Sequence, residues 1–143
     1  METYKEMNSR QRKEFNAFPI GAAFNKEQLR QALVNLGLDP ESGTNDIVSI
    51  GAGCFIRKSD IPAYKEMTAR HAAEREAAIN ADETGEGFIY GMFCYELANH
   101  EYCYTGDPEE TLEALGLTWE DIEKSQALRH GLKLACEACK DEI

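Results

Sequence analysis

The stretch from Phe88 to His100 constrains the fold most strongly, because it is the most apolar part of the chain. Its thirteen residues are longer than a typical strand. Large side chains recur along it in two neighbouring stripes at helical spacing. The segment therefore predicts a buried helix, with a short strand at its beginning as the alternative.

Apolar periodicity and capping signals predict further helices on both sides of this segment. Asn25 with Gln28 and Thr118 with Asp121 have capping-box spacing, and Pro19 ends the first helix. A glycine follows two of the predicted helices, where a left-handed conformation is favourable. The helices are expected over residues 1–18, 26–36, 60–80, 108–116 and 119–140.

Three short runs rich in β-branched, aromatic or small apolar residues predict strands over 20–24, 47–50 and 54–57. The glycine-containing segment 51–53 lies between the last two, which favours a hairpin turn; a ligand-binding loop is the alternative. The predicted fold class is α+β: a mostly helical single globular domain over residues 1–143, with a small two- or three-stranded sheet.

Charge is distributed unevenly along the chain. Residues 1–72 carry ten Lys/Arg and nine Asp/Glu, whereas residues 73–143 carry five and seventeen, so the net charge of −11 comes from the second half. A binder of nucleic acid needs clustered cations, and this balance disfavours direct nucleic-acid binding. It favours a basic protein surface as the partner, with an attraction that weakens as salt rises.

A run of acidic residues without an intervening base is the main candidate binding surface. On two short helices these side chains could present a negative surface that mimics a phosphate backbone and occupies a basic nucleic-acid channel. The alternative is a solvated helix face whose carboxylates stabilise two helix N-termini. The candidate binding residues are Asp107, Glu109, Glu110, Glu113, Glu120, Asp121 and Glu123.

A second candidate site lies at the end of the apolar segment. Glu96 and His100 are four residues apart, so a helix places both on one face, and Glu101 follows directly. Imidazole and carboxylate ligands suit Zn, Mn or Fe, and a site with so few protein ligands leaves room for a reactive water. No second helix offers the complementary spacing, so the alternative is that His100 and Glu101 only terminate a helix.

The five cysteines predict reduced thiols. Their number is odd, and the N-terminus lacks the pattern of a signal peptide, which argues against a disulfide framework. Cys136 and Cys139 have the spacing of a metal or redox pair, but no second such pair completes a zinc site. Packing by buried thiols is the simpler interpretation.

Two exclusions narrow the class of protein. No apolar run is long enough to span a membrane, so no membrane partner and a cytoplasmic location are expected. No nucleophile motif or recognisable triad is present, which favours a non-enzymatic protein while leaving the enzyme question open. No cofactor is expected, apart from a divalent metal such as Zn under the alternative above.

Parts of the chain resemble a family of small uncharacterised proteins from phages, plasmids and conjugative elements of gut bacteria. The resemblance is carried by the segments 95–102, 105–107 and 111–117, with support from 24–28 and 50–53. It implies an accessory role on a mobile element and brings no catalytic residues. The polar members of its motif are Glu96, Asn99, His100, Glu101 and Tyr102.

These observations lead to one main hypothesis and two alternatives. The main hypothesis is a non-catalytic acidic interaction protein of a phage or mobile element, which modulates or inhibits a host nucleic-acid-handling or defence protein, as an anti-CRISPR protein would. The first alternative is a small metal-binding protein or metal-dependent hydrolase centred on Glu96, His100 and Glu101. The second is an accessory protein that acts as a homodimer.

Overall fold

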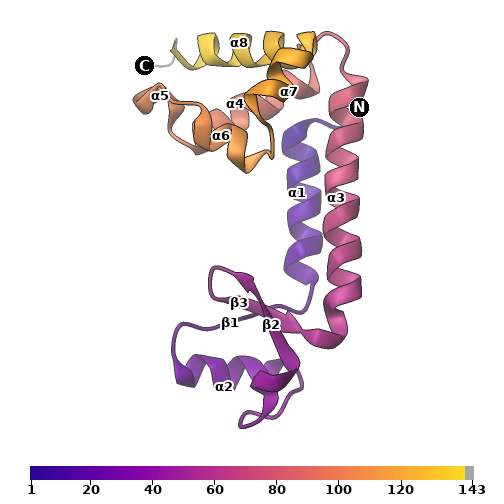
Figure 1. Cartoon of the computed structure of the whole chain (residues 1–143), viewed down its shortest axis with the longest axis vertical. Helices are drawn as coiled ribbons and strands as arrows, with labels where there is room; N and C mark the ends of the chain where they lie inside the picture. Colours follow the sequence, from indigo (N-terminus) through magenta and orange to yellow (C-terminus); the bar gives the residue numbers. More distant parts are fainter. Residues whose placement is uncertain (141–143) are drawn as a thin grey trace. The chain divides into compact units, whose positions relative to one another are not determined.

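A computed structural model describes residues 1–140 of the chain (Figure 1). The described part is mostly helical and has one small three-stranded antiparallel sheet, which confirms the α+β prediction. It divides into two compact units. The sheet unit comprises Gln11–Ala72, and the helical unit comprises Met1–Arg10 with Ala73–Ile143, described as far as Lys140. Whether residues 1–143 act as one domain stays a prediction, and its last three residues lie outside the described part.

The two unit boundaries fall within long helices, which are α1 (Tyr4–Ala17) and α3 (Ile61–Ala81). Both helices occupy the predicted ranges to within a few residues. In the sheet unit, Arg70 of α3 pairs with Glu14 of α1, and Phe15 contacts Tyr64 with ring centroids 6.4 Å apart. In the helical unit, Arg10 pairs with Glu74 at 2.6 Å.

The sheet consists of β1 (Gly21–Ala22), β2 (Ile47–Gly51) and β3 (Cys54–Arg57) in the order β1-β3-β2. The second and third strands match the prediction, but the first is shorter than the predicted 20–24. Its hydrogen bonds explain why: the Phe24 N–H donates to the Gln28 side chain at 2.9 Å and so belongs to the start of the next helix. Between β2 and β3 the chain turns through positive φ at Gly51, Ala52 and Gly53, which confirms the hairpin.

The helix α2 (Lys26–Asn35) covers one face of this sheet. The Asn25 side chain accepts a hydrogen bond from Gln28 N at 2.8 Å, so the predicted cap is confirmed. A small core forms where Ala32, Leu33 and Leu36 pack with Phe55 of β3. Two 3₁₀ turns, at Gly43–Asp46 and Lys58–Asp60, flank the hairpin.

The helical unit is organised around α4 (Phe88–Asn99), the predicted buried helix. Ile89, Met92, Phe93 and Leu97 have no exposed surface. The helix packs along α8 (Gln126–Lys140), and both are visible in Figure 1. Their close approach requires a glycine, because a Cβ on Gly131 would lie 2.5 Å from the Ile89 side chain.

Three short helices complete this unit: α5 (Tyr102–Thr105), α6 (Glu109–Ala114) and α7 (Trp119–Lys124). The capping box of Thr118 with Asp121 is confirmed. The prediction of one helix over 119–140 is wrong, because the chain leaves the helical conformation at Ser125. The Ser125 hydroxyl accepts a hydrogen bond from Leu128 N at 3.1 Å, which starts α8 as a new helix.

Within residues 1–140, none of the helices combines the length and the apolar character needed to cross a membrane.

Candidate functional site

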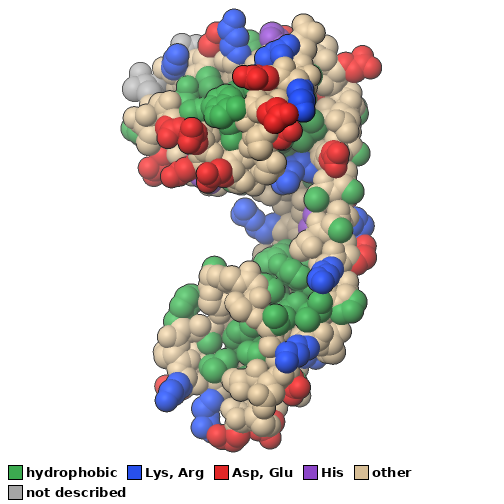
Figure 2. Space-filling view, in the orientation of Figure 1, with side chains coloured by type: hydrophobic (Ala, Val, Ile, Leu, Met, Phe, Trp, Pro, Cys, Tyr) green, Lys and Arg blue, Asp and Glu red, His purple; other side chains and the backbone are tan. Residues whose placement is uncertain are grey.

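The seven predicted acidic residues all belong to the α6–α7 region of the helical unit and are exposed. Figure 2 shows acidic side chains gathered over the part of the surface where Figure 1 places α5 and α6. We call the seven residues the acidic face: Asp107, Glu109, Glu110, Glu113, Glu120, Asp121 and Glu123.

Four members of the acidic face have local partners. Asp107 accepts a hydrogen bond from Glu109 N at 3.0 Å, and Asp121 accepts one from Thr118 N at 2.9 Å. The hydrogen bonds at Thr118 lower the pKa of the Asp121 carboxyl. Glu120 pairs with Lys124 at 2.8 Å, and Glu110 lies 3.9 Å from the His100 ring. These four carboxylates therefore also serve the local structure.

The other three members are Glu109, Glu113 and Glu123. Their side chains make no hydrogen bond and no ion pair within residues 1–140. The helices that carry them are held in place by buried Leu112, Leu115 and Ile122, which pack into the core of the unit. A rigid apolar base thus presents carboxylates that are available to a partner.

Glu96 is the buried polar centre of the same unit. Its side chain is buried on α4 with the residue 8% exposed, and its Oε1 accepts a hydrogen bond from the Tyr4 hydroxyl at 2.6 Å. Burial and the Glu96 carboxylate raise the pKa of the Tyr4 hydroxyl. Tyr4 also contacts the rings of Phe88 and Tyr95, so this hydrogen bond ties the N-terminal turn of α1 to α4.

The predicted pairing of Glu96 with His100 is present. His100 Nε2 lies 3.4 Å from Glu96 Oε2, and the Thr111 hydroxyl donates to the Glu96 carbonyl at 3.3 Å. The imidazole thus lies between a buried carboxylate and exposed Glu110. Such an arrangement orients the ring.

The remaining motif residues do not join this pair. Glu101 begins α5 with a left-handed backbone at φ 58°, and its exposed side chain has no partner within the described chain. Asn99 is exposed as well. Among residues 1–140 no group of three or more His, Cys, Asp or Glu side chains is placed to hold a metal ion. The candidate ligand set of Glu96, His100 and Glu101 is therefore reduced to its first two members.

The structure corrects the prediction of five reduced cysteines. Cys103 and Cys139 form a disulfide that links α5 to α8. Cys136 does not pair with Cys139; its interaction with the Tyr102 hydroxyl, together with burial, raises the pKa of Tyr102. Sequence reasoning missed this pairing because Cys103 lies 36 residues from Cys139, and only the fold brings α5 beside the end of α8.

A further polar residue that the sequence did not single out is Asp82. Burial opposes ionisation of its carboxyl, but N–H donors of Ile89, Gly85 and Gly87 outweigh burial and lower its pKa. Asp82 thereby caps the N-terminus of α4 from seven residues upstream of Ile89. The signal was present as an Asp before a glycine-rich turn.

A family model matches residues 3–138, and the family is described as one of unknown function (DUF7659). No curated protein and no solved structure matches.

Proposed function

The chain belongs to this family of unknown function, so its role is inferred from the site itself: we propose that it is a non-catalytic interaction protein that binds a basic partner surface through its acidic face. The observation that carries the proposal is the set of three carboxylates, Glu109, Glu113 and Glu123, which are exposed and have no partner within residues 1–140. Carboxylates on a rigid surface attract a basic partner and orient it on approach.

The partner class we propose is a host nucleic-acid-handling or defence protein, with this chain acting as an anti-CRISPR-like modulator encoded by a phage or other mobile element. Two points support this class. A basic channel that accommodates a phosphate backbone is complementary to closely spaced carboxylates. The motif over 95–117 resembles accessory proteins of mobile elements.

The proposal is tested with a triple variant, Glu109→Gln, Glu113→Gln and Glu123→Gln. These changes remove charge but leave Asp107 and Asp121 intact, whose carboxylates accept backbone hydrogen bonds. Binding is measured by fluorescence anisotropy with a labelled oligoarginine peptide at low and high salt. We expect the triple variant to bind about tenfold more weakly at low salt, and the difference to shrink at high salt.

A matched control distinguishes an effect of the acidic face on binding from an effect of the net charge. Glu27→Gln, Glu76→Gln and Glu83→Gln remove the same number of exposed carboxylates elsewhere on the protein. This control should bind the peptide almost as well as the wild type. If both triple variants lose the same affinity, the affinity for the peptide depends only on net charge and the acidic face has no special role.

The two triple variants are also compared in the capture of host proteins, with duplex DNA as the competitor.

The alternative of a metal-binding protein or metal-dependent hydrolase is favoured by one observation, the 3.4 Å contact between Glu96 and His100. Elemental mass spectrometry on untagged protein tests it, with His100→Ala and Glu96→Gln as variants. Glu96→Gln keeps an acceptor for Tyr4, so it is less disruptive than alanine. Near-stoichiometric metal that is lost in both variants would support this alternative, and metal-free wild type would count against it.

A further inference from the structure

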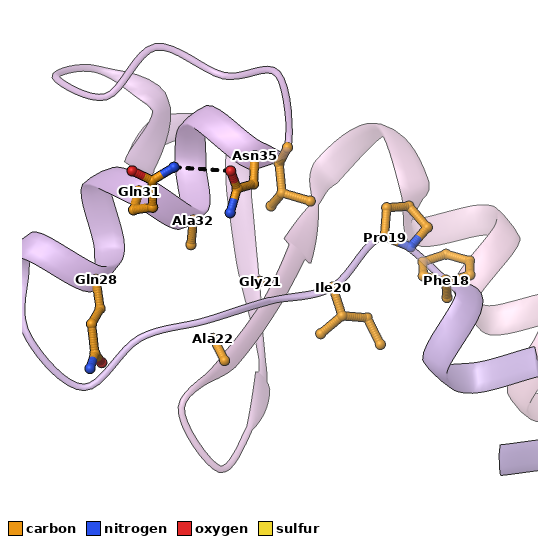
Figure 3. A pocket seen from close by; sticks show the side chains of 10 residues that line it. Phe18, Pro19, Ile20, Gly21, Ala22, Gln28, Gln31, Ala32 and Asn35 are labelled. Atoms are coloured by element: carbon orange, nitrogen blue, oxygen red, sulfur yellow. Dashed lines mark hydrogen bonds between the residues drawn. The ribbon is translucent and has the colours of Figure 1, made fainter. Parts of the chain in front are cut away.

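The sheet unit contains a groove that neither the acidic face nor Glu96 uses. It has a volume of about 460 Å³ and runs between β1 and α2 (Figure 3). One wall is the segment 18–22, which includes the whole of β1. The opposite wall is formed by residues of α2 and its C-terminal end: Gln28, Gln31, Ala32, Asn35 and Leu36. No charged side chain lines the groove.

The strand along this groove has an open edge. In the order β1-β3-β2, β1 pairs only with β3. Gly21 lies opposite Phe55, and Ala23 N donates to the Gly53 carbonyl at 3.0 Å, so these two residues direct their backbone groups toward β3. In an antiparallel ladder this orientation alternates along the strand. The N–H and C=O groups of Ile20 and Ala22 therefore face away from β3.

These outward groups have no partner elsewhere in the described chain. Ala22 is exposed, and outside the β1–β3 ladder the structure gives no hydrogen bond to its backbone. An unpaired strand edge is a template for another strand, because its donors and acceptors repeat at the spacing of an extended peptide.

The helix opposite supplies polar groups of the same kind. Gln28, Gln31 and Asn35 are spaced three and four residues apart and lie along one face of α2, as Figure 3 shows. Gln31 donates to the Asn35 side-chain oxygen at 3.0 Å, and the Asn35 amide nitrogen makes no hydrogen bond within residues 1–140. Neutral amides beside apolar Phe18, Pro19 and Leu36 suit a peptide backbone with uncharged side chains.

We propose that this groove binds an extended, uncharged peptide segment of a partner, which adds to β1 as an edge strand. Main-chain hydrogen bonds to Ile20 and Ala22 hold the segment, and its alternate apolar side chains contact Phe18 on one wall and Leu36 on the other. The inference concerns a different unit and a different ligand chemistry from the acidic face, so it does not depend on the proposed function.

A foreign peptide fits this edge better than a second copy of the chain. If two β1 strands paired antiparallel in one continuous sheet, a twofold axis perpendicular to that sheet would relate the two copies. Both α2 helices would then lie on the same face, beside the shared edge, and compete for the same groove. A lone peptide strand has no such helix.

The test uses a library of short acetylated and amidated peptides composed of Thr, Val, Ile, Tyr and Ser. Affinity selection on the full chain is followed by NMR titration of each selected peptide. We expect saturable shifts of the Ala22 and Ile20 amide signals, together with slower hydrogen exchange at these amides. Failure of every peptide in the library to bind would overturn the proposal.

A substitution at Ala22 locates the binding. Ala22→Pro removes an N–H that β3 does not use, and proline is tolerated on an edge strand. Its matched control is Ala22→Ser, which keeps the N–H. Ala22→Pro should weaken binding about tenfold, and Ala22→Ser should leave it almost unchanged. Equal affinity of both variants would contradict strand addition.

A change in the ligand provides the same test if Ala22→Pro fails to fold. Methylation of alternate backbone nitrogens in a selected peptide removes donors on only one of its edges. One methylated set should lose about tenfold in affinity and the set shifted by one residue should not. Loss from both sets or from neither would contradict the proposal. Shifts of Ala22 that depend on protein concentration alone would identify a second copy as the occupant and overturn it as well.

Discussion

The two units differ in core size and in charge. Among residues 1–140, the helical unit has thirteen residues in its buried apolar cluster, whereas the sheet unit has four. From the sequence, the sheet unit carries a net charge of +1 and the helical unit −12. Burial of a large apolar core stabilises a unit enough to offset the mutual repulsion of exposed carboxylates. Burial of a small core contributes less stabilisation. The acidic face thus lies on the unit with the larger core, and the uncharged groove lies on the unit with the smaller core.

The largest effect is expected from Phe93→Ala in α4. Phe93 is fully buried in the larger cluster, so the change leaves a cavity and should lower the free energy of unfolding by about 3–5 kcal/mol. Urea unfolding measures the loss. A decrease below about 1 kcal/mol would mean that the helical core is loosely packed.

The next effect tests whether the smaller core is a separate unit. Leu33→Ala truncates the fully buried side chain of the sheet-unit cluster. It should lower the free energy of unfolding of the sheet unit by about 3 kcal/mol. Hydrogen exchange should become faster at amides of α2 and β3 and stay nearly unchanged in α4. Equal acceleration in both units would show that they unfold together, and the comparison would fail.

A moderate effect is expected where the helical unit depends on a carboxylate. Asp82→Ala removes the cap of α4 and should destabilise the protein by about 1–2 kcal/mol at neutral pH. Because folding lowers the pKa of Asp82, its contribution is complete above the unfolded pKa of about 3.9 and is lost as the pH falls through the lower folded value. Urea unfolding of wild type and variant at several pH values should show this difference shrinking as the pH falls below the unfolded pKa of about 3.9. A difference that is independent of pH would assign the effect to the turn geometry instead.

The smallest effect on stability is expected on the acidic face. The triple variant at Glu109, Glu113 and Glu123 removes exposed, unpaired carboxylates and should change the free energy of unfolding by less than about 0.5 kcal/mol. Thermal unfolding beside the binding assay checks this. A large gain in stability would show that these charges strain the fold, which would strengthen the case that they are kept for binding.

Helix caps and single helices were predictable where the interactions that form them lie between residues close in the sequence. The caps at Asn25 and Thr118 need only atoms within one helical turn, so spacing alone revealed them. The thirteen-residue apolar segment likewise predicted α4. The break at Ser125 was missed, because no Pro or Gly interrupts residues 119–130 to signal the end of a helix.

The sequence by itself determined most of the helices, the hairpin, the charge asymmetry and the pairing of Glu96 with His100, since each depends on periodicity, composition or contacts between neighbouring residues. Only the tertiary structure decided the disulfide of Cys103 with Cys139, the hydrogen bond of Tyr4 with Glu96, and the groove beside β1. These features join residues far apart in the chain. Their distances are set by how helices and strands pack, and the pattern of a single segment carries no information about that packing.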